Sequence, residues 1–409
     1  MERVVITGMG AITPVGNDVA TFWDSLKNGR CGIGPITKFD VSDFKVKLGA
    51  EVKDFDPTQY MEKREARRAD ANVHYAMAAA IQAVEQAGLK EGNFDPYRTG
   101  VIFGSGVGGL HVVEQEVPKL NEKGPGRVSP FAIPEMIANI AAAYISMHFG
   151  FKGENFCPVS ACATGNHSIG EAMRAIRHGY QDVVVCGGTE NGIIPISMAG
   201  FQNMKAVHMG DDPTAASIPF DARRSGFVMG EGAGCLVLES LTHAQQRGAT
   251  ILAEVAGYGA SGDAYHITSP SPDGDAAAHA IRGAIEDAGL TPADVDYINA
   301  HGTSTPLNEK YETIAIKKAF GDEAYKVKVS STKSMTGHLL GGAAAVEAIA
   351  CVMAIREGIV PPTIGYKEPD PECDLDITPN QAVEMPVNVA ISNSLGFGGH
   401  NACILIKKV

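Results

Sequence analysis

The stretch VVITGMGA, residues 4–11, has a counterpart in AEVAGYGA, residues 253–260. In each stretch a short apolar run is closed by Gly-x-Gly-Ala. Apolar runs of this length, bounded by glycine, are typical of buried strands. Because one pattern recurs in both halves of a chain of 409 residues, we expect the fold to be duplicated internally.

The patterns that follow these two runs also recur in the same order. Each run is followed by a segment with helical spacing that ends at glycine, then by a strand-like run, a glycine loop that opens an alanine-rich helix, and a last strand-like run. The matched pairs are residues 80–89 and 280–290, 100–106 and 296–302, 163–170 and 335–342, and 182–188 and 388–394. Apolar strands that alternate with helices predict sheets covered by helices on both faces.

These patterns predict an α/β protein of two similar halves, residues 1–250 and 251–409. No Ser/Gly-rich or charged linker separates the halves, so we expect them to pack as one body. The first half carries an insertion at about residues 107–150 that is rich in Gly, Pro and Ala. Equivalent loops should meet around a pseudo-twofold axis, which brings Cys162 close to loops of the second half.

Composition excludes several functional classes. The net charge of −13 and the absence of a long basic run argue against general affinity for nucleic acid. No stretch approaches the roughly 18 apolar residues of a membrane span. The first apolar stretch is too short, and too interrupted by Gly and Pro, for a signal peptide. We therefore expect a soluble cytoplasmic protein that binds neither nucleic acid nor membrane.

The eight cysteines include no C-x-x-C pair, which argues against a zinc knuckle, and a cytoplasmic location argues against a disulfide framework. Most of them are interpreted as small buried hydrophobic residues. Cys162, in VSACATGNHSIG at residues 159–170, differs because it precedes a predicted helix with one apolar face. A helix N-terminus lowers the pKa of a thiol and favours the nucleophilic thiolate. On this motif alone, a nucleophile and a core cysteine are equally supported.

Two histidines lie on loops that the duplication places near Cys162. They are His301 in AHGTST and His338 in TGHLLGG. Neutral imidazoles donate hydrogen bonds to a developing oxyanion. Lys333 adds a positive charge to the His338 loop, and Glu347, on the following helix, is the predicted partner of His338.

The stretch GFGGHN, residues 396–401, predicts a third loop at this site. Glycine permits close approach of the backbone to a ligand, so N–H groups here are candidates for an oxyanion hole, with Phe397 as a movable apolar wall. The competing motif GSGVGG, residues 104–109, satisfies G-x-G-x-x-G. Because no acidic residue occurs at the required distance, in GPGRVSPF at residues 124–131, we do not expect a dinucleotide site.

Six stretches together carry a family resemblance. They are VVITGMGAITPVGN, ACATG, IPFDARRSGFVMGEGA, NAHGTSTPLNEKYE, SSTKSMTGHLLGG and SNSLGFGGHNA, and they extend from residue 4 to beyond residue 400. They resemble the condensing-enzyme (thiolase-like) superfamily, and within it the elongating beta-ketoacyl-acyl-carrier-protein synthases of type II. The resemblance implies a duplicated α-β-α-β-α layered fold. It also implies decarboxylative condensation of malonyl-acyl-carrier-protein with an acyl group, a homodimer, acyl carrier protein as partner, and no cofactor.

The resemblance also implies roles for the candidate residues. Cys162 would accept the acyl group, while His301 and His338 would stabilise the enolate formed on decarboxylation. Lys333 and Glu347 would support these charges. The backbone N–H groups of Cys162 and Phe397 would form the oxyanion hole.

Binding roles follow from the same resemblance. The implied substrate contacts are Thr303 and Thr305 to pantetheine, Val107 and Phe201 in the acyl pocket, and Gly398. The implied carrier-docking residues are Lys63, Arg64, Arg67, Arg68, Arg127 and Lys205. At helical spacing Arg64, Arg67 and Arg68 share one face. No metal is required, and a monovalent cation near Asn299, Glu347 and Ser392 is optional.

Other functions stay open at this point. A polyketide-type ketosynthase would share the whole catalytic set. A CoA-dependent thiolase would need a second reactive cysteine in the last glycine loop, which this loop lacks. An inert binding subunit is disfavoured because the Cys-His-His set is intact.

Overall fold

The two stretches that open the repeat are strands β1 and β8, which meet at the centre of the main sheet. The computed structural model describes all residues, 1–409. The first half contributes β1 (Val4–Ile12), β4 (Thr99–Ser105), β5 (Asn155–Phe156), β6 (Val183–Asn191) and β7 (Glu231–Ser240). The second half contributes β8 (Ala253–Gly262), β9 (Tyr297–Asn299), β10 (Lys328–Ser330), β13 (Val389–Gly396) and β14 (His400–Lys407).

The order of strands confirms the predicted duplication. The 10-stranded sheet runs β10-β9-β13-β14-β8-β1-β7-β6-β4-β5, so the same succession leads outward from each side of the β1–β8 contact. That contact is short, pairing Val5 with Glu254 and Ile6 with Ala253. The sequence patterns matched β1 with β8, β4 with β9 and β6 with β13. The pairs β7–β14 and β5–β10 are equivalent in the structure but were not matched by pattern.

Glycine in the opening motif is required by helix packing. A Cβ added at Gly8 would lie 2.0 Å from the Ala83 carbonyl oxygen, and one added at Gly257 would lie 2.0 Å from the Ala284 carbonyl oxygen. A Cβ added at Gly10 or at Gly259 would likewise lie 1.9 Å from a carbonyl oxygen of the covering helix. The motif recurs because each half packs a helix backbone directly onto its first strand.

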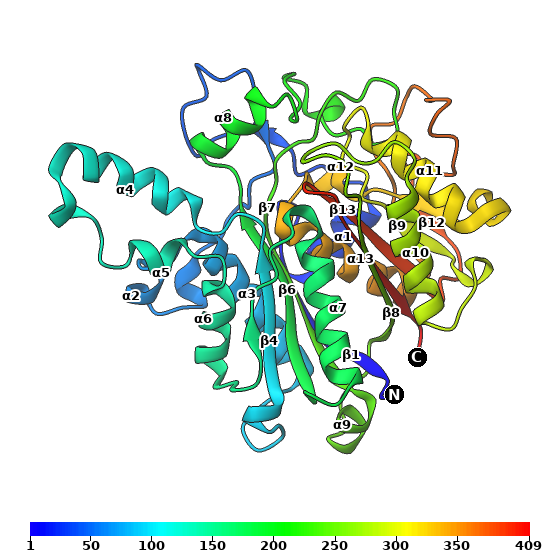
Figure 1. Cartoon of the computed structure of the whole chain (residues 1–409), viewed down its shortest axis with the longest axis horizontal. Helices are drawn as coiled ribbons and strands as arrows, with labels where there is room; N and C mark the ends of the chain where they lie inside the picture. The colour runs from blue at the N-terminus through cyan, green and yellow to red at the C-terminus, as the bar shows by residue number, and fades with distance from the viewer.

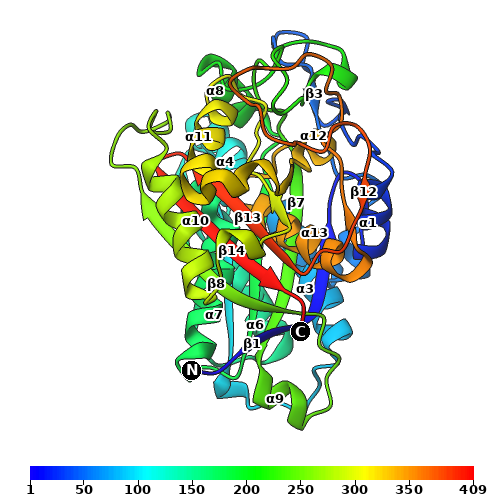
Figure 2. The ribbon, with the colours of Figure 1, turned by 90° about the vertical axis from the view of Figure 1, so that its right-hand side faces the viewer.

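Helices form the other layers. Helices α7 (Thr164–Arg177) and α13 (Ala343–Glu357) lie between the two halves of the sheet and contact strands of both. Helices α3 (Ala71–Ala87) and α6 (Ile140–Phe149) cover the outer face of the first half. Helix α10 (Asp275–Asp287) lies over β8 and β14, with α11 (Asn308–Phe320) beside it (Figure 2). The predicted α-β-α-β-α layering is therefore confirmed.

The apolar core follows these layers. One cluster of buried side chains surrounds α7 and α13, a second lies under α3 and α6, and a third lies under α10 and α11. Helix α13 is buried on nearly all sides, because its sequence is apolar all round. No helix combines the length and apolar character needed to cross a membrane.

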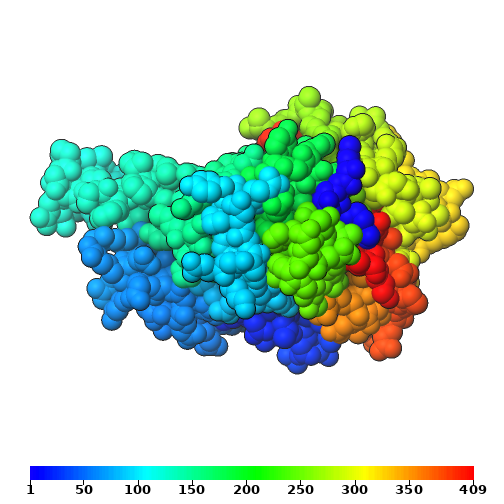
Figure 3. Space-filling model, turned by 90° about the horizontal axis from the view of Figure 1, so that it is seen from below, coloured from blue at the N-terminus to red at the C-terminus, as the bar shows by residue number.

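The insertion in the first half forms an arm. Helices α4 (Leu110–Lys123) and α5 (Ala132–Met136) project from the body, at the left in Figures 1 and 3. The remaining elements are α1 (Val19–Lys27), α2 (Lys63–Ala66), α8 (Pro195–Asn203), α9 (Leu241–Gln246), α12 (Lys333–Thr336), β2 (Gly34–Pro35), β3 (Leu48–Gly49), β11 (Ile359–Val360) and β12 (Val383–Glu384). The division at residues 250 and 251 falls between α9 and β8 and stays a prediction.

Candidate active site

Cys162 lies in a tight turn at the start of α7. The turn Ala161–Ala163 precedes the helix directly, and Ala161 has φ +50, a left-handed conformation that is costly for alanine. The thiol is 7% exposed and lines a cavity of about 520 Å³. Cys162 is thus buried like a core cysteine, but it is also open to a ligand-sized space.

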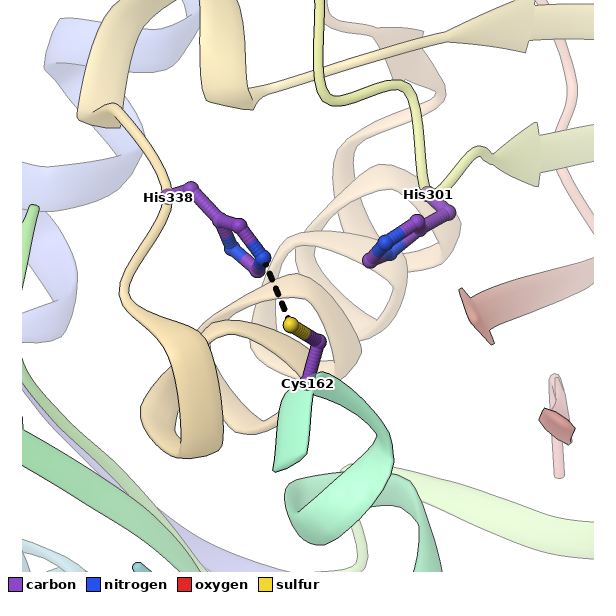
Figure 4. A group of neighbouring side chains, drawn as sticks. All are labelled: Cys162, His301 and His338. Atoms are coloured by element: carbon purple, nitrogen blue, oxygen red, sulfur yellow. Dashed lines mark hydrogen bonds between the residues drawn. The ribbon is translucent and has the colours of Figure 1, made fainter. Parts of the chain in front are cut away.

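Two imidazole rings converge on this thiol, as Figure 4 shows. His338 Nε2 lies 3.0 Å from Cys162 Sγ, and the ring centroids of His301 and His338 are 5.4 Å apart at 84°. One ligand-type atom from each of the three residues lies within 4.8 Å of the others. The structure therefore brings together the three residues that the duplication predicted to meet.

The pKa of the thiol differs from the sequence prediction. Burial raises the pKa of Cys162 to about 12, although Lys333 and the backbone N–H groups of Phe397 and Cys162 oppose this effect. The expected lowering by the helix N-terminus is wrong, because removal of the thiolate from water outweighs the nearby dipoles. The resting thiol is protonated, so a base must take its proton during attack on a substrate.

His338 is placed to be that base. Burial, and after it the positive charge of Lys333, holds the pKa of His338 well below its usual value. The same causes, with a further contribution from His338, lower the pKa of His301. Both rings are therefore neutral, and His338 Nε2 is free to accept the proton of Cys162.

Glu347 was predicted to pair with His338, and this prediction is wrong. Glu347 Oε1 instead accepts a hydrogen bond from Lys333 Nζ, and the two side chains are only 2% and 1% exposed. The ammonium is the stronger partner for a buried carboxylate. The ion pair holds Lys333 near the two histidines, where its charge adds to burial in lowering the pKa of both imidazoles.

The Phe397 loop approaches Cys162 closely. A Cβ at Gly396 would lie 2.7 Å from the Ser160 carbonyl oxygen and 3.3 Å from the Cys162 nitrogen, so glycine is needed for this approach. The backbone N–H groups of Phe397 and Cys162 both point to the sulfur. Donors that converge on a nucleophile suit the stabilisation of an oxyanion on an acyl group attached there, and the predicted oxyanion hole stays a prediction.

The cavity contains most of the predicted substrate contacts. Val107, Phe201, Thr303 and Thr305 line it, and the hydroxyls of the two threonines are 2.9 Å apart. Gly398 does not line the cavity. Its N–H donates to the Ile267 carbonyl oxygen at 2.8 Å, and the substrate contact at Gly398 stays a prediction.

Several lining residues were not identified from sequence. They include Ala161, Met204, Phe227, Asp263, Thr268 and Leu340. Phe227 packs its ring against His338, with centroids 5.4 Å apart. Apolar residues such as these have the same sequence pattern as core residues, so no motif distinguishes them.

The docking residues predicted at 63–68 lie on and just after helix α2. Helix α2 ends at Ala66, and Arg67 and Arg68 continue its turn, with N–H groups that donate to the carbonyl oxygens of residues 63 and 65. Arg67 is exposed, as are Lys63 and Arg64, whereas the guanidinium of Arg68 lies 4.4 Å from the ring centroid of Phe131. The expected shared face stays a prediction, and Arg68 differs from its neighbours in this contact.

The remaining docking candidates lie elsewhere. Lys205 lines the cavity and is exposed, with φ +57. Arg127 is exposed at the end of the short turn Pro125–Arg127 that follows α4.

The residues of the optional cation site have unpaired oxygen atoms. Asn299 and Ser392 are register partners on parallel strands β9 and β13, against which α13 packs. Asn299 Oδ1, Ser392 Oγ and Glu347 Oε2 are buried without hydrogen-bond partners. Buried unpaired oxygens are costly, and a hard cation would satisfy them, so these residues fit the implied ion.

Comparison with known proteins agrees with the site geometry. The family model "Beta-ketoacyl synthase, N-terminal domain" matches residues 1–244, and "Beta-ketoacyl synthase, C-terminal domain" matches residues 252–367. The chain is 53% identical over 408 residues to 3-oxoacyl-[acyl-carrier-protein] synthase 2 of Synechocystis sp., covering 100% of this chain and 98% of the relative. It is 50% identical over 407 residues to the Staphylococcus aureus (strain N315) protein of the same name, with the same coverage.

Solved structures show the same fold. A beta-ketoacyl synthase from Burkholderia phymatum matches with a TM-score of 0.93 and 33% identity, covering 100% of both chains. A ketosynthase solved in complex with its type II polyketide acyl-carrier protein also matches with a TM-score of 0.93, at 34% identity, covering 100% of this chain and 99% of that one. With its thiolase-like fold and matching domains, this chain belongs to the beta-ketoacyl synthase family.

Proposed function

We propose that this protein is a 3-oxoacyl-acyl-carrier-protein synthase, an acyltransferase of fatty-acid elongation. It joins an acyl group held on Cys162 to the carbon unit supplied by malonyl-acyl-carrier-protein, and it releases CO2. The observation that carries the proposal is the meeting of one buried thiol with two neutral imidazoles on a cavity of about 520 Å³. High identity to synthases of this type supports fatty-acid elongation over polyketide synthesis.

Acyl transfer begins with loss of the thiol proton. His338 Nε2, 3.0 Å from Sγ, accepts this proton as the sulfur attacks the thioester carbonyl of the acyl carrier. The N–H groups of Cys162 and Phe397 hold the resulting oxyanion. Collapse of this intermediate expels the carrier thiolate, which takes the proton from His338 and leaves the acyl group on Cys162.

Condensation uses both histidines as donors. Once Cys162 is acylated, His338 as its Nε2–H tautomer and His301 donate hydrogen bonds to the thioester oxygen of the malonyl group, which stabilises the enolate as CO2 leaves. The enolate carbon then attacks the acyl carbonyl on Cys162. Expulsion of the Cys162 thiolate completes the 3-oxoacyl product, and a proton taken up from solvent restores the thiol.

Substitutions separate these steps. Cys162→Ala is expected to abolish acyl transfer and condensation. His301→Ala should still accept an acyl group but decarboxylate malonyl-acyl-carrier-protein more slowly by about 10²–10³-fold, the usual cost of one lost oxyanion donor. Mass spectrometry of the acyl-enzyme and release of labelled CO2 measure the two steps, with Cys186→Ala as the control. Normal decarboxylation by His301→Ala would contradict the proposed role.

The acyl carrier protein is the proposed partner. Exposed Arg64 and Arg67, on an acidic chain, offer local positive charge to an acidic carrier. Reversal of both to glutamate should raise KM for acyl-acyl-carrier-protein and leave reaction with a small acyl thioester unchanged. Equal losses with both substrates would contradict docking at this segment.

A homodimer is the proposed assembly. Edge strand β5 is exposed, and large apolar side chains on it, just after it and on α6, which packs against it, are exposed as well: Phe156 42%, Val159 57% and Met147 67%. Apolar patches beside an open strand edge mark interfaces. Light scattering after size exclusion tests the dimer, and Phe156→Asp should weaken it. All eight cysteines are unpaired, which fits a reducing compartment such as the cytoplasm.

A further inference from the structure

Glu190, at the end of β6, is a buried carboxylate whose role is not explained by the steps above. It is 0% exposed, and its oxygen atoms accept hydrogen bonds from hydroxyl and backbone N–H groups. Oε1 accepts from Ser105 Oγ at 2.8 Å and from the Val107 nitrogen at 3.3 Å. Oε2 accepts from the Gly106 nitrogen at 2.8 Å and from the Gly341 nitrogen at 3.1 Å.

These donors come from opposite halves of the protein. Gly106 and Val107 follow β4 and form part of the cavity wall. Gly341 belongs to the short turn Leu340–Gly342, which begins two residues after His338. One carboxylate therefore bonds the acyl side of the cavity to the segment that carries the catalytic base.

The two segments touch beside this carboxylate. A Cβ at Gly341 would lie 2.4 Å from the Gly106 nitrogen, and one at Gly106 would lie 2.8 Å from Glu190 Oε2. Ser105 Oγ also accepts from the Gly108 nitrogen at 2.9 Å, which extends the network along the wall. Because the N–H groups of both segments donate to the Glu190 carboxylate, and buried N–H groups need an acceptor, the position of both segments depends on Glu190.

We infer that Glu190 is a positioning residue that holds the cavity wall at Gly106–Val107 against the turn after His338, and thereby sets acyl-chain preference. This inference rests on the proposed function. It is independent of the ion pair between Lys333 and Glu347.

The charge of Glu190 has a second, separable effect. Burial raises the pKa of Glu190 to about 7, against the hydrogen bonds that favour its charged form. Its negative charge in turn contributes to the raised pKa of Cys162. Shape and charge therefore act on different measurable quantities, the acyl preference and the titration of the thiol.

Two substitutions separate shape from charge, each in a Cys31→Ser background because Cys31 is an exposed thiol. Glu190→Asp keeps the charge but shortens the side chain. It should change the ratio of kcat/KM between long and short acyl carriers by about tenfold, the effect of losing one charge-assisted hydrogen bond. The pH dependence of Cys162 alkylation should stay near that of the wild type.

Glu190→Gln keeps the length but removes the charge. It should shift the alkylation profile of Cys162 to lower pH. Glu239→Gln is the matched control, because Glu239 is equally buried but bonds to Thr7, His243 and Arg247 instead. This control should lower Tm without changing either readout. Ser105→Ala, which removes one donor only, provides a milder variant if the others do not fold.

The outcomes are distinct. An unchanged acyl preference in Glu190→Asp, or in a folded Ser105→Ala if Asp does not fold, would overturn the inference. If Glu239→Gln changed the acyl preference as much as Glu190→Asp does, the inference would also be overturned, because any substitution of a buried carboxylate would then have the same effect. If the wild-type protein does not condense acyl and malonyl carriers, the proposed function fails, and the inferred control of acyl preference fails with it. In that case Glu190→Gln should still shift the pH profile of Cys162 alkylation, because this effect requires no condensation.

Discussion

Replacement of Lys333 by methionine tests how the buried ion pair affects His301 and His338. Lys333→Met keeps the length of the side chain but leaves Glu347 buried without its cation. Removal of one partner from a buried pair costs about 3–5 kcal/mol. For a chain of this length, with ~2.1 cal/mol/K of unfolding entropy per residue, Tm should fall by about 3.5–6 °C.

The loss of stability should depend on pH. Burial raises the pKa of Glu347 to about 7 even with Lys333 present, and loss of the cation would raise it further. A carboxyl whose folded-state pKa lies above its unfolded value contributes stability at low pH and loses it as pH rises through the folded pKa. The difference in stability between wild type and Lys333→Met should therefore be larger at pH 8 than at pH 6, as measured by denaturant unfolding.

The double variant Lys333→Met, Glu347→Met separates stability from catalysis. Apolar replacement of both partners should recover most of the stability. It should not restore the wild-type pH dependence of decarboxylation, because the charge that adds to burial in lowering the pKa of His301 and His338 is absent. The acid limb of the pH–rate profile should move to higher pH. A wild-type acid limb in the double variant would refute this reasoning.

The buried His338, the packing of Gly8 and the ligand set around Cys162 each give a further test. His338→Asn should reduce the loss of stability between pH 6.5 and pH 5.5 by about 1 kcal/mol, since His338 has its pKa lowered in the folded state and only the unfolded chain takes up that proton; unfolding curves at the two pH values measure this. Gly8→Ala should cost about 1–3 kcal/mol by pushing α3 off the sheet, whereas Gly283→Ala, with its nearest neighbour at 3.5 Å, should gain up to ~1 kcal/mol in calorimetry. Zn²⁺ should slow alkylation of Cys162, and a chelator should reverse this, because His301 and His338 complete a set of zinc-type ligands; alkylation at the same rate with and without Zn²⁺ would contradict it.

Much of the fold follows from local patterns that are visible in the sequence. Gly8 and Gly257 mark equivalent strands, because each half must admit a helix backbone at that point. The spacing of apolar residues that predicts a strand or a helix depends only on residues close together in the sequence. The duplication can therefore be predicted without the tertiary structure. Strands β7 and β14 both adjoin glycine-rich stretches, GEGAG at residues 230–234 and GFGG at residues 396–399, but the comparison of patterns did not pair them.

The residues of the site were predictable, but their electrostatics were not. Cys162, His301 and His338 were expected to meet because equivalent loops of a duplicated fold converge. The pKa of the thiol was expected to fall, and the structure shows that burial raises it. Glu347 was assigned to His338, and the structure pairs it with Lys333.

Sequence by itself determined the duplicated architecture, the loops that carry the chemistry and the kinds of residue on them, because these depend on local period and on order along the chain. Only the tertiary structure decided which charges pair, how far each group lies from water, and which backbone N–H groups are free. Glu190 illustrates the difference: in sequence it is one acidic residue after a strand, yet in the structure it accepts hydrogen bonds from both halves. Solvation and pairing depend on what surrounds a group in space, and the neighbours that decide them are distant along the chain.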